Sequence, residues 1–547
     1  MKKPALPAFS VVQFKAMIPS LPERLRTPAF ILFTALVLVA ASVFSPPTEA
    51  LAFSPIIIVL AGMLLFQQGG QTAGPVGFIA GLMIASQHFG LTPQILAYSQ
   101  WKGLNLTLFI ISILFPALVL YGVVNHAGGF ERFARAMSAL IPHQGILWLV
   151  VAWAFSAIME GVAGFGLPIA VAAPILIGMG MDPLLAVASV AVGHSWSVTY
   201  GDMGAIYLTL HQLVRTPTAE FAPYAAIFFG AAILLTGWAV TRLQGGQVKL
   251  TWLLLLSGGM ITTQSLLTLN GMASISDLAT GLVGIAIGAL ISRRITPASQ
   301  AVHYDRSLRS AIFSYGALAA ALFVINSFPP IHEALASIEW RADFPSLTTT
   351  SGYTSKPSAQ VYHPLLNTGL VTFLVAGGTY LVNRRWGLYR GVKFSRIMAE
   401  TTHLSWQAIL GIAFMVGLSN IMDFSGMSLQ MAEVVSSALG RWVPLFSPLI
   451  GNLGAFASGS NTNSNVLFAS MQENIGLILG LSPAILVAAQ TAGGSLGSMI
   501  APAKIIVGCT TANLRGREGE VIRLTLPYAL LIGGLTGLLT LGLTFLK

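Results

Sequence analysis

Charged side chains are scarce in this sequence. They make up 8% of its 547 residues, whereas soluble globular proteins carry about 25%. The shortage recurs along the whole chain, as apolar runs separated by short polar breaks, and the mean hydropathy is +0.77. These features predict an all-α polytopic membrane protein. A transmembrane β-barrel would instead show alternating segments about ten residues long.

Cysteine is almost absent, and enzyme signatures are few. The single Cys509 excludes an internal disulfide and a thiolate metal cluster. HExxH and the phosphate-binding Gly-x-x-x-x-Gly-Lys-Ser/Thr motif are missing, and GGSLGS at 493–498 is a weak signal by itself. We therefore expect no enzyme, no cofactor and no metal site. The net charge of +10 is attributed to Lys and Arg in cytoplasmic loops rather than to nucleic-acid binding.

Long apolar segments dominate what is present. Thirteen of them are long enough to cross a bilayer, at about 28–45, 52–67, 72–86, 104–125, 183–213, 222–240, 250–268, 275–291, 310–327, 365–382, 406–424, 483–512 and 527–546. Basic residues cluster in alternate loops, which predicts a cytoplasmic N-terminus, thirteen crossings and an external C-terminus. The first 30 residues are basic and broken before the first long apolar run, so no cleavable signal peptide is expected.

Two further apolar stretches, 146–180 and 446–480, are interrupted at their centres by EGVAGFG (160–166) and SGSNTNSN (458–465). Each arm is left with about 14 residues, which reach roughly 21 Å at 1.5 Å per residue, short of a hydrocarbon core roughly 30 Å thick. We therefore predict two re-entrant helical hairpins. Polar backbone at this depth is tolerated only inside protein or beside a watery cavity.

The two halves align with an offset of 300 residues, which places Glu160 opposite Ser460, Gly193 opposite Gly493 and Ser195 opposite Ser495. The charge pattern gives the halves opposite orientations, so we predict inverted repeats, each with a hairpin and a broken helix. The alternative, alignment by shared composition alone, stays open. The predicted divisions are N-terminal spans 1–103; a first repeat 104–240 with hairpin 146–180 and broken helix 183–213; connecting spans 241–403 with external loop 328–364; and a second repeat 404–547 with hairpin 446–480 and broken helix 483–512.

Helix N-termini near Gly166, Ser464, Ser195 and Ser495 would point at one region. Each carries a partial positive charge and unpaired N–H groups, which suits a small anion such as a carboxylate. For the polar side chains the alternative is helix capping or helix–helix hydrogen bonding. The candidate substrate-binding residues are Gly161, Gly164, Phe165, Gly166, Ser195, Ser460, Asn461, Thr462, Asn463, Ser464, Asn465, Gly493, Gly494 and Ser495.

Three ionisable residues accompany the breaks: Glu160, His194 and Asp202. An ionisable side chain at bilayer depth costs at least about 2.5–3.5 kcal/mol, so each is a candidate for proton coupling. We predict that Glu160 carries the coupled proton, because a neutral Glu160 tolerates a nearby anion and an ionised one repels it. The alternatives are a Glu160 that only holds hairpin backbone, a His194 that only packs, and an Asp202 solvated at the outer end of its helix.

Three motifs resemble those of the L-lactate permease family, proton-coupled carriers of lactate and glycolate: MEGVAGFGLPIAV (159–171), SGSNTNSNVLFASMQ (458–472) and TAGGSLGSMIAP (491–502). The resemblance implies an ion-transporter-superfamily fold with a scaffold domain, a mobile domain carrying both hairpins, elevator-type movement and often a dimer. The chain departs from the family pattern at four positions. Asn461 stands where the family has an acidic residue, and Ser498 stands where it has a Lys, although Lys504 follows six residues on. His194 stands where the family has an Asn, and Asp202 stands at a position that is neutral in the family.

Together these features predict a secondary active transporter of small monocarboxylates, similar to lactate and glycolate, across the inner membrane by proton symport. The expected partners are a carboxylate anion, a proton, membrane lipid and, through the resemblance, a second copy of the chain. The alternative is a sodium-coupled or differently selective organic-anion transporter on the same fold, since the amide and backbone oxygens of SNTNSN can coordinate sodium.

Overall fold

The computed structural model describes residues 22–44, 46–164, 166–297, 303–389 and 391–546. Phe165, one of the candidate binding residues, lies outside these ranges. The first half contains the helices α2 (Glu23–Phe44), α3 (Thr48–Leu64), α4 (Gly70–His88), α5 (Pro93–His126), α6 (Gly129–Leu140), α7 (Gln144–Val150), α8 (Ser156–Val162), α9 (Leu167–Gly178), α10 (Pro183–Gly193), α11 (Gly201–Leu213), α12 (Thr218–Leu243) and α13 (Leu250–Leu269).

The second half is also helical apart from two short strands. Its elements are α14 (Ala273–Ile295), α15 (Arg306–Ser327), α16 (Pro329–Ala336), β1 (Trp340–Phe344), β2 (Ser358–Tyr362), α17 (Thr368–Arg385), α18 (Phe394–Ser425), α19 (Met427–Leu439), α20 (Val443–Ser458), α21 (Asn461–Ile478), α22 (Pro483–Gly497), α23 (Pro502–Thr511) and α24 (Glu518–Phe545). The antiparallel pair β1–β2 lies in the predicted loop 328–364. The prediction of a purely helical chain missed this ribbon.

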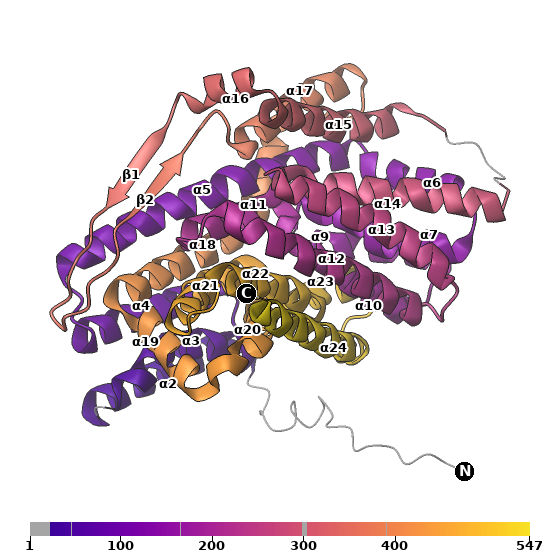
Figure 1. Ribbon diagram of the computed structural model, residues 1–547. Helices are drawn as coiled ribbons and strands as arrows, with labels where there is room; N and C mark the ends of the chain where they lie inside the picture. Colours follow the sequence, from indigo (N-terminus) through magenta and orange to yellow (C-terminus); the bar gives the residue numbers. More distant parts are fainter. Residues whose placement is uncertain (1–21, 45, 165, 298–302, 390, 547) are drawn as a thin grey trace, which may run out of the picture.

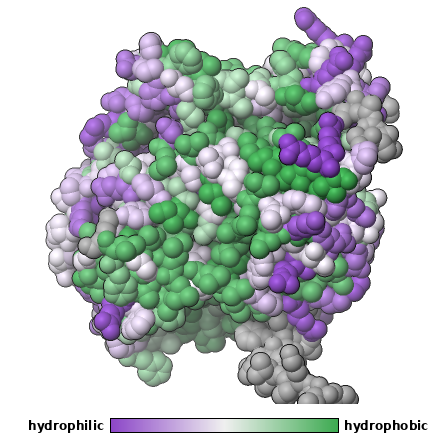
Figure 2. Space-filling model, turned by 45° about the vertical axis from the view of Figure 1, so that its right-hand side comes forward, coloured by the Kyte–Doolittle hydropathy of each residue, from purple (hydrophilic) through white to green (hydrophobic). Residues whose placement is uncertain are grey.

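Helices coincide with all thirteen apolar segments, and ten helical stretches of the described chain are long and apolar enough to cross a membrane. This confirms a polytopic helical membrane protein, whereas the figure of thirteen crossings stays a prediction. Large apolar side chains are exposed on many of these helices. Figure 2 shows them as a broad hydrophobic area in the middle of one face, with hydrophilic side chains gathered toward its left and right edges. Lipid contact accounts for such a surface, because an apolar area of this size is rare on soluble proteins.

Two long helices, α5 and α18, pack against each other, with α4 against α18 and α17 alongside α5 (Figure 1). They have 34 and 32 residues, so each is about 50 Å long at 1.5 Å per residue. Both begin well before the predicted spans 104–125 and 406–424. The hairpin helices α20 and α21 lie against α22, and α8 lies against α14.

Each predicted hairpin consists of two helical arms that pack against each other across a short break. The first arm of the first hairpin runs through α7, a π-helical turn (Val151–Phe155) and α8. Each break contains a left-handed glycine, a conformation that other residues adopt only at a cost: Gly166, at φ 82°, precedes α9, and Gly459, at φ 70°, ends α20. The second break is narrower than expected, because α21 begins at Asn461 rather than near Ser464. The first arm, Gln144–Val162, has 19 residues, more than the 14 expected. Whether the hairpins are re-entrant stays a prediction.

Both predicted broken helices are interrupted, although later than expected. The first leaves α-helical geometry at His194 and resumes in α11, where Asp202 and Met203 have φ of 50° and 56°. The second has an extended Ala501 before Pro502, where α23 begins. The predicted starts of the second halves, near Ser195 and Ser495, are therefore wrong by about two helical turns. Left-handed backbone at residues other than glycine stores strain and clusters at functional sites.

Candidate functional site

The first hairpin tip holds a buried ion pair. Glu160, at the end of α8, is 1% exposed. Its Oε1 accepts a hydrogen bond from Lys504 Nζ at 3.3 Å. Lys504 lies in the first turn of α23, in the second half of the chain. Position 498, where the family resemblance leads one to expect a lysine, is Ser498, and the lysine at this tip is Lys504, six residues further on.

Asp202 closes the same tip from α11. Its Oδ1 accepts a hydrogen bond from Gly164 N at 2.7 Å, and the residue is 6% exposed. The alternative of a solvated Asp202 at a helix end is therefore wrong. A Cβ on Gly164 would lie 2.9 Å from Asp202 Oδ2 and 3.0 Å from Glu160 Oε1. Glycine at this position is what lets the two carboxyl groups converge on the backbone of the tip.

A third buried carboxyl group, Asp277 on α14, was missed in the sequence analysis. A Cβ on Gly161 would lie 2.7 Å from Asp277 Cβ, so Asp277 packs directly on the hairpin. It is 1% exposed, and neither of its oxygens has a hydrogen-bond partner in the described part of the chain. An acidic residue inside the apolar segment 275–291 was the signal that could have identified it.

The two broken helices cross at the residues that the offset of 300 pairs. Ser495 Oγ donates a hydrogen bond to the carbonyl oxygen of Ser195 at 2.6 Å. Beside it, Thr199 Oγ1 donates to the carbonyl oxygen of Thr491 at 3.1 Å, and Thr199 N donates to Ser495 Oγ at 3.3 Å. Contact between equivalent residues is what a two-fold axis relating the halves would produce. The repeat itself stays a prediction.

The second tip reaches this crossing through its amides. Asn461 Nδ2 donates to Thr199 Oγ1 at 2.8 Å and to the Thr491 carbonyl oxygen at 3.3 Å. Asn465 Nδ2 donates to Thr491 Oγ1 at 2.9 Å. Ser460 caps α21 by accepting from Asn463 N, and Ser464 Oγ donates to Gly451 O. Capping and helix–helix contacts therefore account for part of this cluster.

The Oδ1 atoms of Asn461, Asn463 and Asn465 have no partner in the described part of the chain, although all three residues are buried. Thr462 is 7% exposed. Unsatisfied acceptors at this depth are costly unless a ligand or water completes them. The second tip therefore offers acceptor oxygens that its packing contacts do not use.

The remaining candidates are packing positions next to the site. A Cβ on Gly193 would meet the Ala152 carbonyl oxygen, and one on Gly493 would meet that of Pro448. In both halves the broken helix thus lies directly on the first hairpin arm. Gly494 faces Asn461. Buried His194 hydrogen-bonds to Val190 O through Nδ1 at 2.8 Å, while its Nε2 has no partner among the described residues.

The two tips lie on either side of one helix end. A Cβ on Gly166 would be 3.7 Å from Lys504 Cα, and one on Gly459 would be 3.0 Å from Ala503 Cβ. The N-termini of α9, α21 and α23 thus gather around the first turn of α23. The structure brings Glu160, Asp202 and the two tips together, and it adds Lys504 and Asp277 to the predicted set. Among the described residues, no group of three or more His, Cys, Asp or Glu side chains could hold a metal ion.

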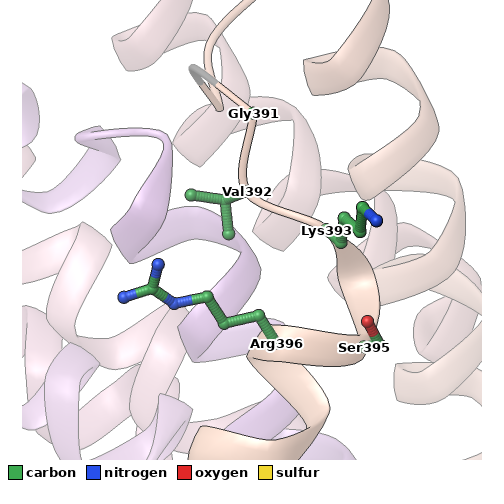
Figure 3. Close-up of a pocket in the computed structure, with 5 residues that line it drawn as sticks. All are labelled: Gly391, Val392, Lys393, Ser395 and Arg396. Carbon is green, nitrogen blue, oxygen red and sulfur yellow. The ribbon is translucent and has the colours of Figure 1, made fainter.

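Two surface hollows lie elsewhere. One, of about 290 Å³, is lined by α5, Gln212 and the β-ribbon. Figure 3 shows the other, of about 400 Å³ at the start of α18, where Arg396 extends beneath Val392 and Lys393 points the opposite way. Neither hollow is lined by a predicted site residue. The described residues of the first tip and those of the second from Asn461 on are buried, whereas Ser458, Gly459 and Ser460 are half-buried.

A second buried ionic cluster was also missed. Glu473 on α21 accepts hydrogen bonds from the turn after α11, at Arg215 N and Thr216. The Arg215 guanidinium also lies 3.6 Å from Asp423 on α18. Buried Lys102 on α5 lies over the Phe424 ring, 5.5 Å from its centroid. These contacts join the second hairpin to the two long helices.

The sequence profile of the L-lactate permease family matches residues 49–547. The chain belongs to the L-lactate permease family. It is therefore a multi-pass membrane transporter and not an enzyme, as predicted. Curated relatives agree. The glycolate permease GlcA of Escherichia coli (strain K12) is 27% identical over 533 residues, covering 90% of this permease and 94% of the relative. The L-lactate permease of Bacillus subtilis (strain 168) is 24% identical over 535 residues, covering 88% and 93%.

Among solved structures, the chain is similar to the YdaH transporter of Alcanivorax borkumensis, with a TM-score of 0.46 and 18% identity over 83% of this permease and 89% of that chain. Neisseria gonorrhoeae MtrF also has a TM-score of 0.46, with 12% identity over 87% and 94%.

Proposed function

We propose that this permease is a proton-coupled symporter of small monocarboxylates, similar to lactate and glycolate, in the inner membrane. The observation that carries the proposal is Glu160, a buried carboxyl group at a hairpin tip whose Oε2 has no partner in the described chain. A carboxyl group placed beside an anion site couples the two ligands, because its proton removes the charge that would repel the anion. The relatives named as lactate and glycolate permeases support this substrate class.

The transport cycle that we propose moves the two hairpins together, as an elevator. The supporting observation is that the tips, the crossing at Ser195 and Ser495, and Lys504 form one continuous buried unit. Inverted repeats with broken helices are common in secondary transporters, where the substrate binds between the halves. We further propose thirteen crossings, a cytoplasmic N-terminus, an external C-terminus and a homodimer.

A sodium-coupled carrier is the second candidate. It is favoured by the three asparagine Oδ1 atoms of the second tip, which are buried without a partner in the described residues. Amide oxygens are suitable ligands for sodium, and a bound cation would satisfy them. Under this alternative Glu160 would serve only as the counter-ion of Lys504, 3.3 Å away.

Uptake into proteoliposomes under separately imposed gradients distinguishes the two. We expect an inward proton gradient to drive accumulation of labelled lactate or glycolate, and a sodium gradient at equal pH to have no effect. Glu160→Gln is expected to lose the response to the proton gradient, whereas Glu433→Gln, an exposed glutamate on α19, should retain it. Sodium-driven uptake without a proton response would overturn proton coupling. Selective transport of dicarboxylates would overturn the substrate class.

A further inference from the structure

Lys504 is the positively charged side chain at the hairpin tips. Its side chain is 6% exposed and that of Glu160 is 2% exposed. The two residues are 344 positions apart and belong to different halves of the chain. An ammonium group has three N–H donors, and the one hydrogen bond that Lys504 makes within the described ranges goes to Glu160 Oε1. Two donors therefore remain for a ligand.

Three carboxyl groups gather at this hairpin tip, and Lys504 pairs with one of them, Glu160. Asp202 on α11 lies beside Glu160 at Gly164, and Asp277 on α14 packs on Gly161. The buried ring of His194 lies at the interrupted end of α10. If all three carboxyl groups were ionised, two negative charges would be left without a counter-ion away from water, which is strongly unfavourable. At least some of these carboxyl groups must therefore be protonated. The number of protons decides whether Lys504 is paired with a carboxylate of the protein.

The position of Lys504 suits a carboxylate ligand. It lies in the first turn of α23, where the backbone N–H groups have no acceptor within the helix. Gly166, where the N-terminus of α9 begins, approaches the Lys504 backbone. The positive ends of these two helices and the buried ammonium group together form a stronger anion site than the ammonium group would form alone.

We propose that Lys504 is the residue that binds the substrate carboxylate, and that Glu160 controls its availability. Ionised Glu160 holds Lys504 in the ion pair seen in the structure; a proton on Oε1 or Oε2 of Glu160 breaks this pair and releases the ammonium to the substrate. This inference rests on the proposed function, since it assigns the anion half of the same symport.

When the substrate carboxylate replaces Glu160 as the partner of Lys504, proton binding favours anion binding and anion binding favours proton binding. Loading adds one proton and one monocarboxylate anion, so the net charge of the buried cluster is the same in the empty and the loaded states. An anion without a proton would compete with Glu160 for Lys504, and a proton without an anion would leave Lys504 unpaired in a buried site. Both half-loaded states are disfavoured, which limits leakage of either ligand.

A double-variant comparison separates this role from that of a structural counter-ion. Binding of lactate or glycolate to purified protein is measured by ligand-dependent thermal stabilisation, at pH 6 and pH 8. Wild type should bind more tightly at pH 6. Glu160→Gln should lose this pH dependence. Lys504→Gln should weaken binding at least tenfold at both pH values, the loss expected for one charge-assisted hydrogen bond of about 1.5–3 kcal/mol.

The Glu160→Gln/Lys504→Gln protein decides between the roles. Its two neutral side chains replace both members of the ion pair, so neither member is left as an unpaired buried charge, and the double variant should remain folded even if Lys504→Gln does not. If Lys504 only balances Glu160, the double variant recovers wild-type affinity, and the inference is overturned. If Lys504 binds the carboxylate, affinity stays at least tenfold weaker. A wild-type protein that transports no monocarboxylate would refute the proposed function instead. The two failures are therefore distinguishable.

Discussion

Replacing Glu473 tests how the second hairpin is held to the rest of the protein. Glu473 is 5% exposed. Its Oε1 accepts hydrogen bonds from Arg215 N at 2.7 Å and from Thr216 N and Thr216 Oγ1, both at 2.8 Å. Glu473→Ala removes the acceptor of all three donors, whereas Glu473→Gln keeps an acceptor oxygen and removes only the charge.

The loss of stability in Glu473→Ala comes from the partners of Glu473, which stay buried without it. Removing one member of a buried charged network costs about 3–5 kcal/mol, because its partners stay buried. The Arg215 side chain is 30% exposed, so water can solvate part of it, and about 3 kcal/mol is the better figure for Glu473→Ala. Glu473→Gln exchanges charge-assisted hydrogen bonds for neutral ones, a loss of about 1–2 kcal/mol.

The measurement is the temperature at which detergent-solubilised protein loses its monodisperse elution. We expect the order wild type, Glu473→Gln, Glu473→Ala, with the largest drop for the last. Glu433→Ala is the control, because exposed substitutions usually change stability by less than about 0.5 kcal/mol. A Glu473→Ala protein as stable as Glu433→Ala, or a Glu473→Gln protein as unstable as Glu473→Ala, would refute the reasoning.

Two further predictions use the same heating assay. Gly493→Ala places a Cβ against the Pro448 carbonyl oxygen and should destabilise by about 1–3 kcal/mol through overpacking. Gly258→Ala, on α13 with no atom within 4 Å of its Cβ position, should stabilise by up to about 1 kcal/mol through helix propensity. Equal effects of the two substitutions would contradict the close contact between α22 and the hairpin arm α20. Asn461→Ala removes the amide that donates to Thr199 Oγ1 and to the Thr491 carbonyl oxygen, which keeps Thr199 Oγ1 as a donor. It should cost about 0.5–1.5 kcal/mol and reduce monocarboxylate uptake, whereas unchanged stability and uptake would exclude Asn461 from the crossing.

Much of the candidate site was visible in local sequence signals. Glu160 stands out because an acidic residue interrupts an apolar run, and the cluster of glycines after it favours a helix end there. The tip SGSNTNSN was recognisable by the same contrast, although its width was overestimated. Asn461 through Asn465 can continue a helix once Ser460 caps it, so α21 begins three residues earlier than expected.

Other features depended on the folded chain. Only the fold shows that Asp277 contacts Gly161 at the hairpin. The strained Asp202 and Met203 mark a break that the sequence analysis placed too early, near Ser195. The β1–β2 ribbon forms within a polar loop that carries no strong strand pattern.

The sequence alone determined that this chain is a helical membrane protein of the L-lactate permease family, where its apolar segments lie and where they are interrupted. These properties depend on the composition and order of neighbouring residues. Only the tertiary structure decided that Lys504 pairs with Glu160 and that Ser495 meets Ser195. The physical reason is that the energy of an ion pair or a hydrogen bond depends on distances of a few ångströms, and hydropathy carries no information about which distant segments come that close.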